Sequence, residues 1–184
     1  MKLRKTELWV GGILVAVVLL GTVALAAGAY DTSATVKPSW LERTVAPWLV
    51  DRSVARRAPK GPNPIQATPE VLAKGLAEYR EHCLICHGVP GEPQTAIGAG
   101  LNPTAPDLGD PDSQEGSDGE LFQFISAGVR MTGMPAFSKS ESQETIWKLV
   151  TFVRHLPKLT DDERRALQAR HGGREEAEES KPRP

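Results

Sequence analysis

Residues 82–88 read HCLICHG, and this stretch contains the only two cysteines of the 184-residue chain. Cys83 and Cys86 are three residues apart, and His87 follows directly. A helix has 3.6 residues per turn, so this spacing places both thiols and the imidazole within about one turn. The stretch therefore predicts a site whose chemistry uses two thiols and one imidazole.

Four kinds of site use such residues. A disulfide would not need His87, a thioredoxin-like redox pair belongs with a βαβ pattern that this sequence lacks, and a structural zinc site normally has four protein ligands. The fourth is covalent attachment of haem, for which C-x-x-C-H is the sequence signature. There the thiols of Cys83 and Cys86 bond to the haem vinyl groups, and His87 ligates the iron. We interpret the motif as the attachment site of one haem c.

A second iron ligand is predicted within residues 130–137, which read RMTGMPAF. A thioether is a soft, neutral ligand, and Met134 lies between a glycine that permits close backbone approach and a proline that disfavours helix. Met131 is the alternative ligand, and a third interpretation makes both methionines packing residues. With His87 and Met134 as metal ligands no coordination position is open, so we predict no catalytic residue and no enzyme.

Apolar spacing predicts an all-α fold with three helices around the motif and no strand. The first helix begins at residues 68–70 and runs into the cysteine motif, the second spans residues 118–128, and the third begins within residues 138–142 and ends at Pro157. Residues 88–116 are rich in Gly, Pro, Asp and Asn and predict a long loop. Three short helices bury little apolar area, so a further group is expected to fill the centre.

The N-terminal segment is basic at first and then uncharged. Lys2, Arg4 and Lys5 precede residues 8–29, which contain no charged side chain. That stretch would be about 33 Å long as a helix, and the hydrocarbon core of a bilayer is about 30 Å thick. Residues 1–30 are therefore predicted to be a single-pass anchor in the cell inner membrane, with the remainder in the periplasm. A cleaved signal peptide is the alternative, although its apolar core is usually about 7–15 residues.

Residues 31–67 contain five prolines and predict a semi-rigid linker. Within this linker, apolar residues recur at roughly helical spacing and are followed by arginines, which predicts a short amphipathic helix on the membrane surface. Docking of this helix on the domain or on a partner subunit is the alternative. The apolar residues are Trp40, Leu41, Val45, Trp48 and Leu49.

The segment of residues 68–158 is predicted to be the functional domain, and it is acidic. Between residues 68 and 157 there are 12 Asp and Glu against six Lys and Arg, a net charge of 6 − 12 = −6. This balance excludes a basic nucleic-acid footprint and suits a partner with a basic face. Residues 159–184 predict a short helix followed by a disordered charged tail. His82 is expected to be exposed, and neither His155 nor His171 is predicted to ligate a metal.

The sequence resembles the class I c-type cytochromes, in particular the membrane-anchored bacterial type with a single haem. The resemblance rests on residues 83–88, on residues 133–137 and on a helix that contains Trp147, and it covers roughly residues 68–158. It implies the cytochrome c fold, a small helical domain around a covalent haem in which the first and last helices cross. Gly75 and Tyr79 would then face Trp147 and Val150.

The same resemblance implies the roles of the site residues. Cys83 and Cys86 would bond the haem, His87 would be the proximal ligand and Met134 the distal ligand. The carbonyl of Pro106 would accept a hydrogen bond from His87 and so orient the ring.

These expectations describe a single-electron carrier tethered to the outer, periplasmic face of the cytoplasmic membrane. Its partners would be redox proteins, including membrane-bound complexes, and membrane lipid through the N-terminal helix, but not nucleic acid. One alternative is a cytochrome c subunit of a larger membrane oxidoreductase. The other is a haem-based ligand sensor or peroxidase-like enzyme, which would need a labile or absent methionine ligand.

Overall fold

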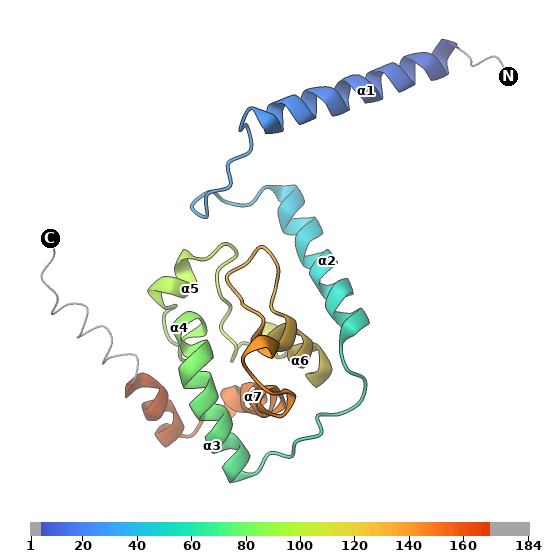
Figure 1. The fold of residues 1–184 in the computed structure, drawn as a ribbon. Coiled ribbons are helices and arrows are strands. Elements are labelled where there is room, and N and C mark those ends of the chain that lie inside the picture. Colours follow the sequence, from blue (N-terminus) through green and yellow to red (C-terminus); the bar gives the residue numbers. More distant parts are fainter. Residues whose placement is uncertain (1–4, 170–184) are drawn as a thin grey trace, which may run out of the picture. The chain divides into compact units, whose positions relative to one another are not determined.

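The computed structural model describes residues 5–169, and every regular element in that range is a helix (Figure 1). The chain divides into two compact units, one ending at Lys37 and the other beginning at Pro38. The all-α expectation is thus confirmed for the described residues. The predicted disordered tail, residues 174–184, lies outside them.

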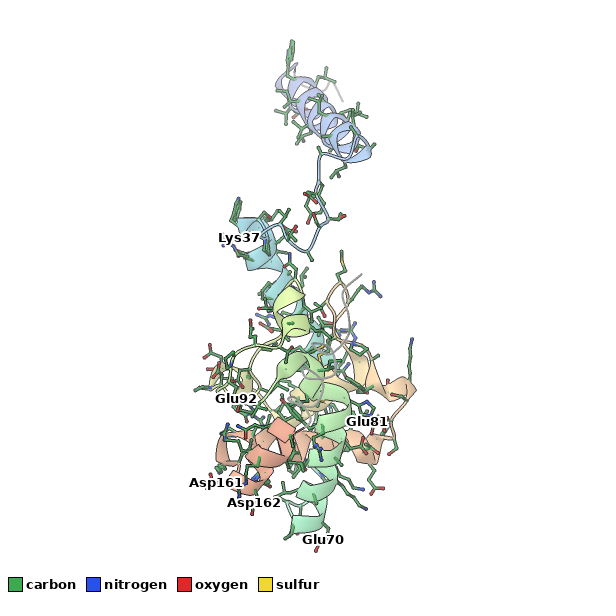
Figure 2. The ribbon with its side chains drawn as sticks, turned by 90° about the vertical axis from the view of Figure 1, so that its left-hand side faces the viewer. Lys37, Glu70, Glu81, Glu92, Asp161 and Asp162 are labelled. Carbon is green, nitrogen blue, oxygen red and sulfur yellow. The ribbon has the colours of Figure 1, made fainter. Side chains whose placement is uncertain are left out.

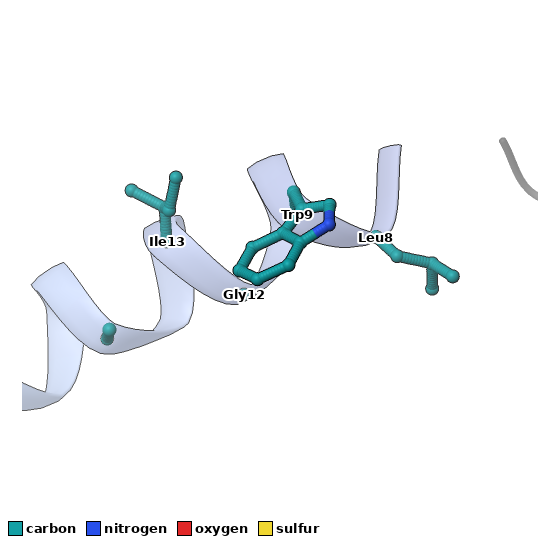
Figure 3. Close-up of a pocket in the computed structure, with 5 residues that line it drawn as sticks. Leu8, Trp9, Gly12 and Ile13 are labelled. Atoms are coloured by element: carbon teal, nitrogen blue, oxygen red, sulfur yellow. The ribbon is translucent and has the colours of Figure 1, made fainter. Parts of the chain in front are cut away.

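The first unit contains α1 (Lys5–Ala26). Within it, the 20 residues Glu7–Ala26 are long and apolar enough to cross a membrane. Leu8 and Ile13 project from this helix and are exposed (Figure 3). The hollow beside Trp9 is lined by α1 alone, including Gly12 and Ala16. It is therefore a shallow groove on the surface of a single helix, at the small residues Gly12 and Ala16, and not a ligand site.

The second unit begins with α2 (Trp40–Arg57), which starts at a capping box. The Ser39 hydroxyl accepts from the Glu42 amide, and the Glu42 carboxylate accepts from the Ser39 amide. α2 packs against α6 (Asp118–Ala127), and Val54 near the C-terminal end of α2 and Ala58 just after it are buried. This part of the predicted linker is therefore folded onto the domain. The sequence did not predict this contact because Val54 and Ala58 have small side chains and lie among arginines.

The helix that leads into the cysteine motif is not uniform. It consists of α3 (Pro69–Glu78), the π-helical turn η1 (Tyr79–Cys83) and α4 (Leu84–His87). The Thr68 hydroxyl caps its start, as predicted. A π-turn inserts one residue into the helical ladder and is frequent at functional sites. It changes the direction in which the residues after Tyr79 project.

The first and last helices of the domain cross at a glycine. At Gly75 of α3, an added Cβ would lie 2.5 Å from the Cβ of Phe152, which belongs to α7 (Gln143–His155). The ring of Tyr79 lies 5.6 Å from that of Phe152. Phe152 is thus the aromatic residue of α7 that meets Gly75 and Tyr79. Trp147 of the same helix stacks on Phe122 of α6, with ring centroids 4.3 Å apart. α7 ends before the predicted Pro157, which lies in the 3-10 turn η4 (Leu156–Lys158).

The predicted long loop of residues 88–116 contains two short elements, α5 (Ala96–Gly100) and the 3-10 turn η2 (Asp112–Gln114). Residues 161–169 form the predicted helix after the domain, and its Leu167 is fully buried in the same core as α7. The acidic excess is spread over the surface, where Glu70, Glu81 and Asp161 point outward from different elements (Figure 2). Charge alone therefore does not mark a single docking face.

Candidate functional site

The cysteine motif lies at the C-terminal end of the first helix of the domain, with Cys83 in η1 and Cys86 in α4. Cys83 and Cys86 are not joined by a disulfide. Burial raises the pKa of Cys83 to about 12 and also raises the pKa of Cys86, so both thiols are protonated at neutral pH. Among the described residues, these two and His87 do not form a cluster of converging metal ligands. This arrangement disfavours a zinc thiolate site.

His87 is held in one tautomer by the loop that follows the motif. Its Nδ1 lies 2.8 Å from the carbonyl oxygen of Pro106. A carbonyl can only accept, so Nδ1 carries the proton and Nε2 keeps a free lone pair. Burial lowers the pKa of His87, and the hydrogen bond to Pro106 and the charge of Asp107 only partly oppose this shift. The ring is therefore neutral at neutral pH and can ligate a metal through Nε2.

The loop around Pro106 is fixed by its neighbour Asp107. One carboxylate oxygen of Asp107 accepts from the amide of Gly91, and the other accepts from the amide of Gly109, each at 2.7 Å. The hydroxyl of Ser113 donates to the Asp107 carbonyl at 2.6 Å. Gly91 lies only four residues after His87. The hydrogen bond from Gly91 to Asp107 therefore connects the segment after the cysteine motif to the Pro106 carbonyl, which orients His87. Sequence reasoning did not identify Asp107, although an Asp-x-Gly turn beside Pro106 was a usable signal.

A short clamp holds the last turn of the motif helix. The Thr95 hydroxyl donates to the carbonyl of Ile85 at 2.8 Å and accepts from the amide of Gly98 at 2.9 Å. A Cβ added at Gly98 would lie only 2.1 Å from the carbonyl oxygen of Cys86, so α5 packs directly on the motif backbone. The carbonyl oxygens at a helix end need partners outside the helix, and the buried Thr95 supplies one.

The two candidate methionines have different environments. Met131 is 92% exposed and has a φ of 62°, whereas Met134 is half-buried and packs against the core. The segment between them is held by Thr132, whose hydroxyl donates to the carbonyl of Val129 at 2.8 Å and accepts from the amide of Met134 at 3.1 Å. We call residues 129–134 the methionine strap. It presents Met134, not Met131, to the interior of the domain.

The side chains of this region include groups that can hold a haem iron. These groups are two neighbouring thiols, a neutral imidazole with a free Nε2 and a half-buried thioether. Soft sulfur and imidazole ligands suit iron in this setting.

Comparison with known families supports the same assignment. Residues 70–153 match the family described as cytochrome c oxidase, cbb3-type, subunit III. A search of curated proteins found no significant match. The matched range begins in α3 and ends in α7, so it includes the cysteine motif, the Pro106 loop and the methionine strap.

Proposed function

We propose that residues 70–153 form a class I c-type cytochrome domain and that the chain is a single-electron carrier with one covalent haem c, ligated by His87 and Met134. The observation that carries the proposal is the 2.8 Å hydrogen bond from Nδ1 of His87 to Pro106, which leaves Nε2 of this C-x-x-C-H histidine free to ligate a metal. Bound haem would supply a ferrous–ferric couple that stores one electron.

The residues of this chain would hold that group and limit its chemistry. Cys83 and Cys86 would tether it through thioether bonds, and two cysteines in the sequence provide for one such attachment. The Nε2 of His87 and the sulfur of Met134 would be the protein ligands of its iron. Because no position is then open to a substrate, the site would pass electrons to a docked redox partner and would not act as an enzyme.

We place the domain on the periplasmic face of the inner membrane, with α1 as the anchor. The apolar segment Glu7–Ala26 is long enough to span a bilayer, and the basic residues that precede it favour a cytoplasmic N-terminus. A tether of this kind would confine the carrier near membrane-bound partners and so raise its effective concentration there.

The N-terminal part of α2 supports a contact with the membrane surface. Its apolar side chains are exposed, with Trp40 at 71% and Trp48 at 56%. Arg52 and Arg56 continue the same helical row, where they can meet lipid phosphates. Residues 27–39 connect α1 to α2 and extend at most about 45 Å, so a bilayer that held α1 would be within reach of α2.

A second candidate function is that of a cytochrome subunit of a larger membrane oxidase, and the match to an oxidase subunit family favours it. In that case the exposed face of α2 would contact another subunit. Mild detergent extraction followed by size-exclusion chromatography separates the two proposals. A free carrier elutes at the size of one chain in its micelle, whereas a subunit co-elutes with other membrane proteins.

The test of the electron-carrier proposal is a reduced-minus-oxidised spectrum of membranes that contain the full chain. We expect the bands of a c-type haem and, in the oxidised protein, a methionine–iron charge-transfer band. Met134→Ala should abolish that band, and Met131→Ala is the matched control that should retain it. Loss of the band with Met131→Ala instead would contradict the assigned ligand, and its absence from the unmodified protein would favour the sensor or peroxidase alternative.

A further inference from the structure

Three ionisable side chains converge beside the motif helix, apart from the proposed haem ligands. Glu78 ends α3, His82 follows one turn later in η1, and Glu141 lies between the 3-10 turn η3 (Phe137–Lys139) and α7. The Nε2 of His82 is 3.5 Å from a carboxylate oxygen of Glu78 and 3.3 Å from one of Glu141. The three atoms lie within 4.8 Å of one another. His82, which the sequence led us to expect at the surface, is only 24% exposed.

The spacing of these atoms suits a shared cation better than a pair of hydrogen bonds. Tetrahedral Zn²⁺ with bonds of about 2.1 Å separates its ligand atoms by about 3.4 Å, which matches both distances from His82. Charge-assisted hydrogen bonds between nitrogen and carboxylate are shorter, about 2.7–2.9 Å. The chain offers its own comparison, because Nε2 of His155 is hydrogen-bonded to Glu163 at 3.0 Å with a single carboxylate as partner.

The ligands are also oriented by their surroundings. The ring of Phe137 packs on the ring of His82, with centroids 5.5 Å apart. The carboxylates of Glu78 and Glu141 are 31% and 19% exposed, so they are partly shielded from solvent yet reachable by an ion. The two carboxylates can balance the charge of a divalent cation.

We propose that Glu78, His82 and Glu141 form a site for a divalent first-row cation of the Zn²⁺ type, with water as the fourth ligand. Imidazole nitrogen and carboxylate oxygen are ordinary ligands of Zn²⁺, and three protein ligands leave one position open. Phe137 and Glu141 follow the methionine strap in the chain, so a bound cation cross-links the segment after the strap to the motif helix. This consequence for the strap rests on the proposed function, whereas the cation site itself does not.

The test is isothermal titration of chelator-treated, full-length protein in detergent with Zn²⁺. The unmodified chain should bind one Zn²⁺ at this site. His82→Ala and Glu141→Gln should each weaken that binding by more than about tenfold. His155→Ala removes the other described His–Glu pair, and Glu144→Gln removes a nearby exposed carboxylate, so both controls should leave the binding unchanged.

Equal binding by the unmodified protein and His82→Ala would overturn the proposal, as would a comparable loss with His155→Ala. If the unmodified chain takes up no Zn²⁺, the cluster is an ion pair only. Glu141→Gln changes a residue outside the helices and keeps the test decisive if His82→Ala fails to fold. The haem spectrum of each sample is read separately: failure of the electron-carrier proposal removes that spectrum from every sample, and failure of the cation site leaves it intact.

Discussion

Replacement of Gly98 by alanine should separate α5 from the cysteine motif. The new Cβ would lie 2.1 Å from the carbonyl oxygen of Cys86 and 3.0 Å from the hydroxyl of Thr95. An ordinary carbon–oxygen contact is more than 3 Å, so the two backbones must move apart by about 1 Å. Neither obstacle is the flexible end of a long side chain, and the movement also stretches the 2.8 Å bond from Thr95 to Ile85.

The magnitude follows from two contributions. Overpacking of this kind costs about 1–3 kcal/mol, and loss of one hydrogen bond costs about 0.5–1.5 kcal/mol. The better helix propensity of alanine, up to about 1 kcal/mol, is common to Gly98→Ala and Gly100→Ala and cancels between them. Gly100→Ala in the same short helix is the matched control, since nothing lies within 4 Å of its added Cβ. We expect Gly98→Ala to be less stable than Gly100→Ala by about 2–4 kcal/mol.

The assay is urea unfolding of the full-length protein in detergent, followed by haem absorbance with circular dichroism as a second probe. The midpoint of Gly98→Ala should fall clearly below that of Gly100→Ala, and thermal unfolding should differ by about 10 °C or more. Two variants with free energies of unfolding within about 0.5 kcal/mol of each other would show that α5 does not clamp the motif.

Three further perturbations test the packing and charges of the domain. Gly75→Ala should destabilise by about 1–3 kcal/mol in the same urea assay because its Cβ would overlap that of Phe152; an unchanged midpoint would refute the close crossing of α3 and α7. Arg154→Gln should lower the free energy of unfolding by about 2–4 kcal/mol because the Arg154 guanidinium donates to two backbone carbonyls and to Asp118. Arg165→Gln, which removes an exposed ion pair with Asp162, should lower it by less than about 0.5 kcal/mol, and equal losses in the two variants would refute this ranking. Hydrogen bonds from the Ser117 amide and hydroxyl lower the pKa of Glu120, so its stabilisation is present above the unfolded pKa and is lost as pH falls through the folded pKa. Glu120→Gln should flatten that part of an acid titration of the unfolding midpoint, and an unchanged titration would contradict this origin.

The main helices could be predicted from the sequence because their signals are local. Thr68 and Ser117 are N-cap residues followed by apolar residues at helical spacing, and both cap the helices expected there. The C-x-x-C-H motif predicts haem attachment, and the neighbours Gly133 and Pro135 favour Met134 over Met131 as the second ligand; both assignments stay predictions. In each case the deciding residues lie within a few positions of one another.

The features that the sequence did not predict depend on contacts across the chain. Thr95 clamps the motif from a helix of five residues, too short for any periodicity to be read. His82 is half-buried because Glu141, 59 positions later, lies against it. The C-terminal end of α2 packs on α6 because Gly119 has no side chain and admits the carbonyl of Pro59, where a Cβ would come within 2.1 Å. Contacts between residues so far apart in the chain leave no pattern among neighbouring residues of the sequence.

The central claim, a haem bonded to Cys83 and Cys86, is tested most directly by the intact mass of the full chain produced together with haem-attachment machinery. The account predicts the mass of the polypeptide plus one haem, retained under denaturing conditions that release any non-covalent cofactor. The double variant Cys83→Ser with Cys86→Ser should show the polypeptide mass alone. The bare polypeptide mass for the unmodified chain under the same conditions would contradict the account.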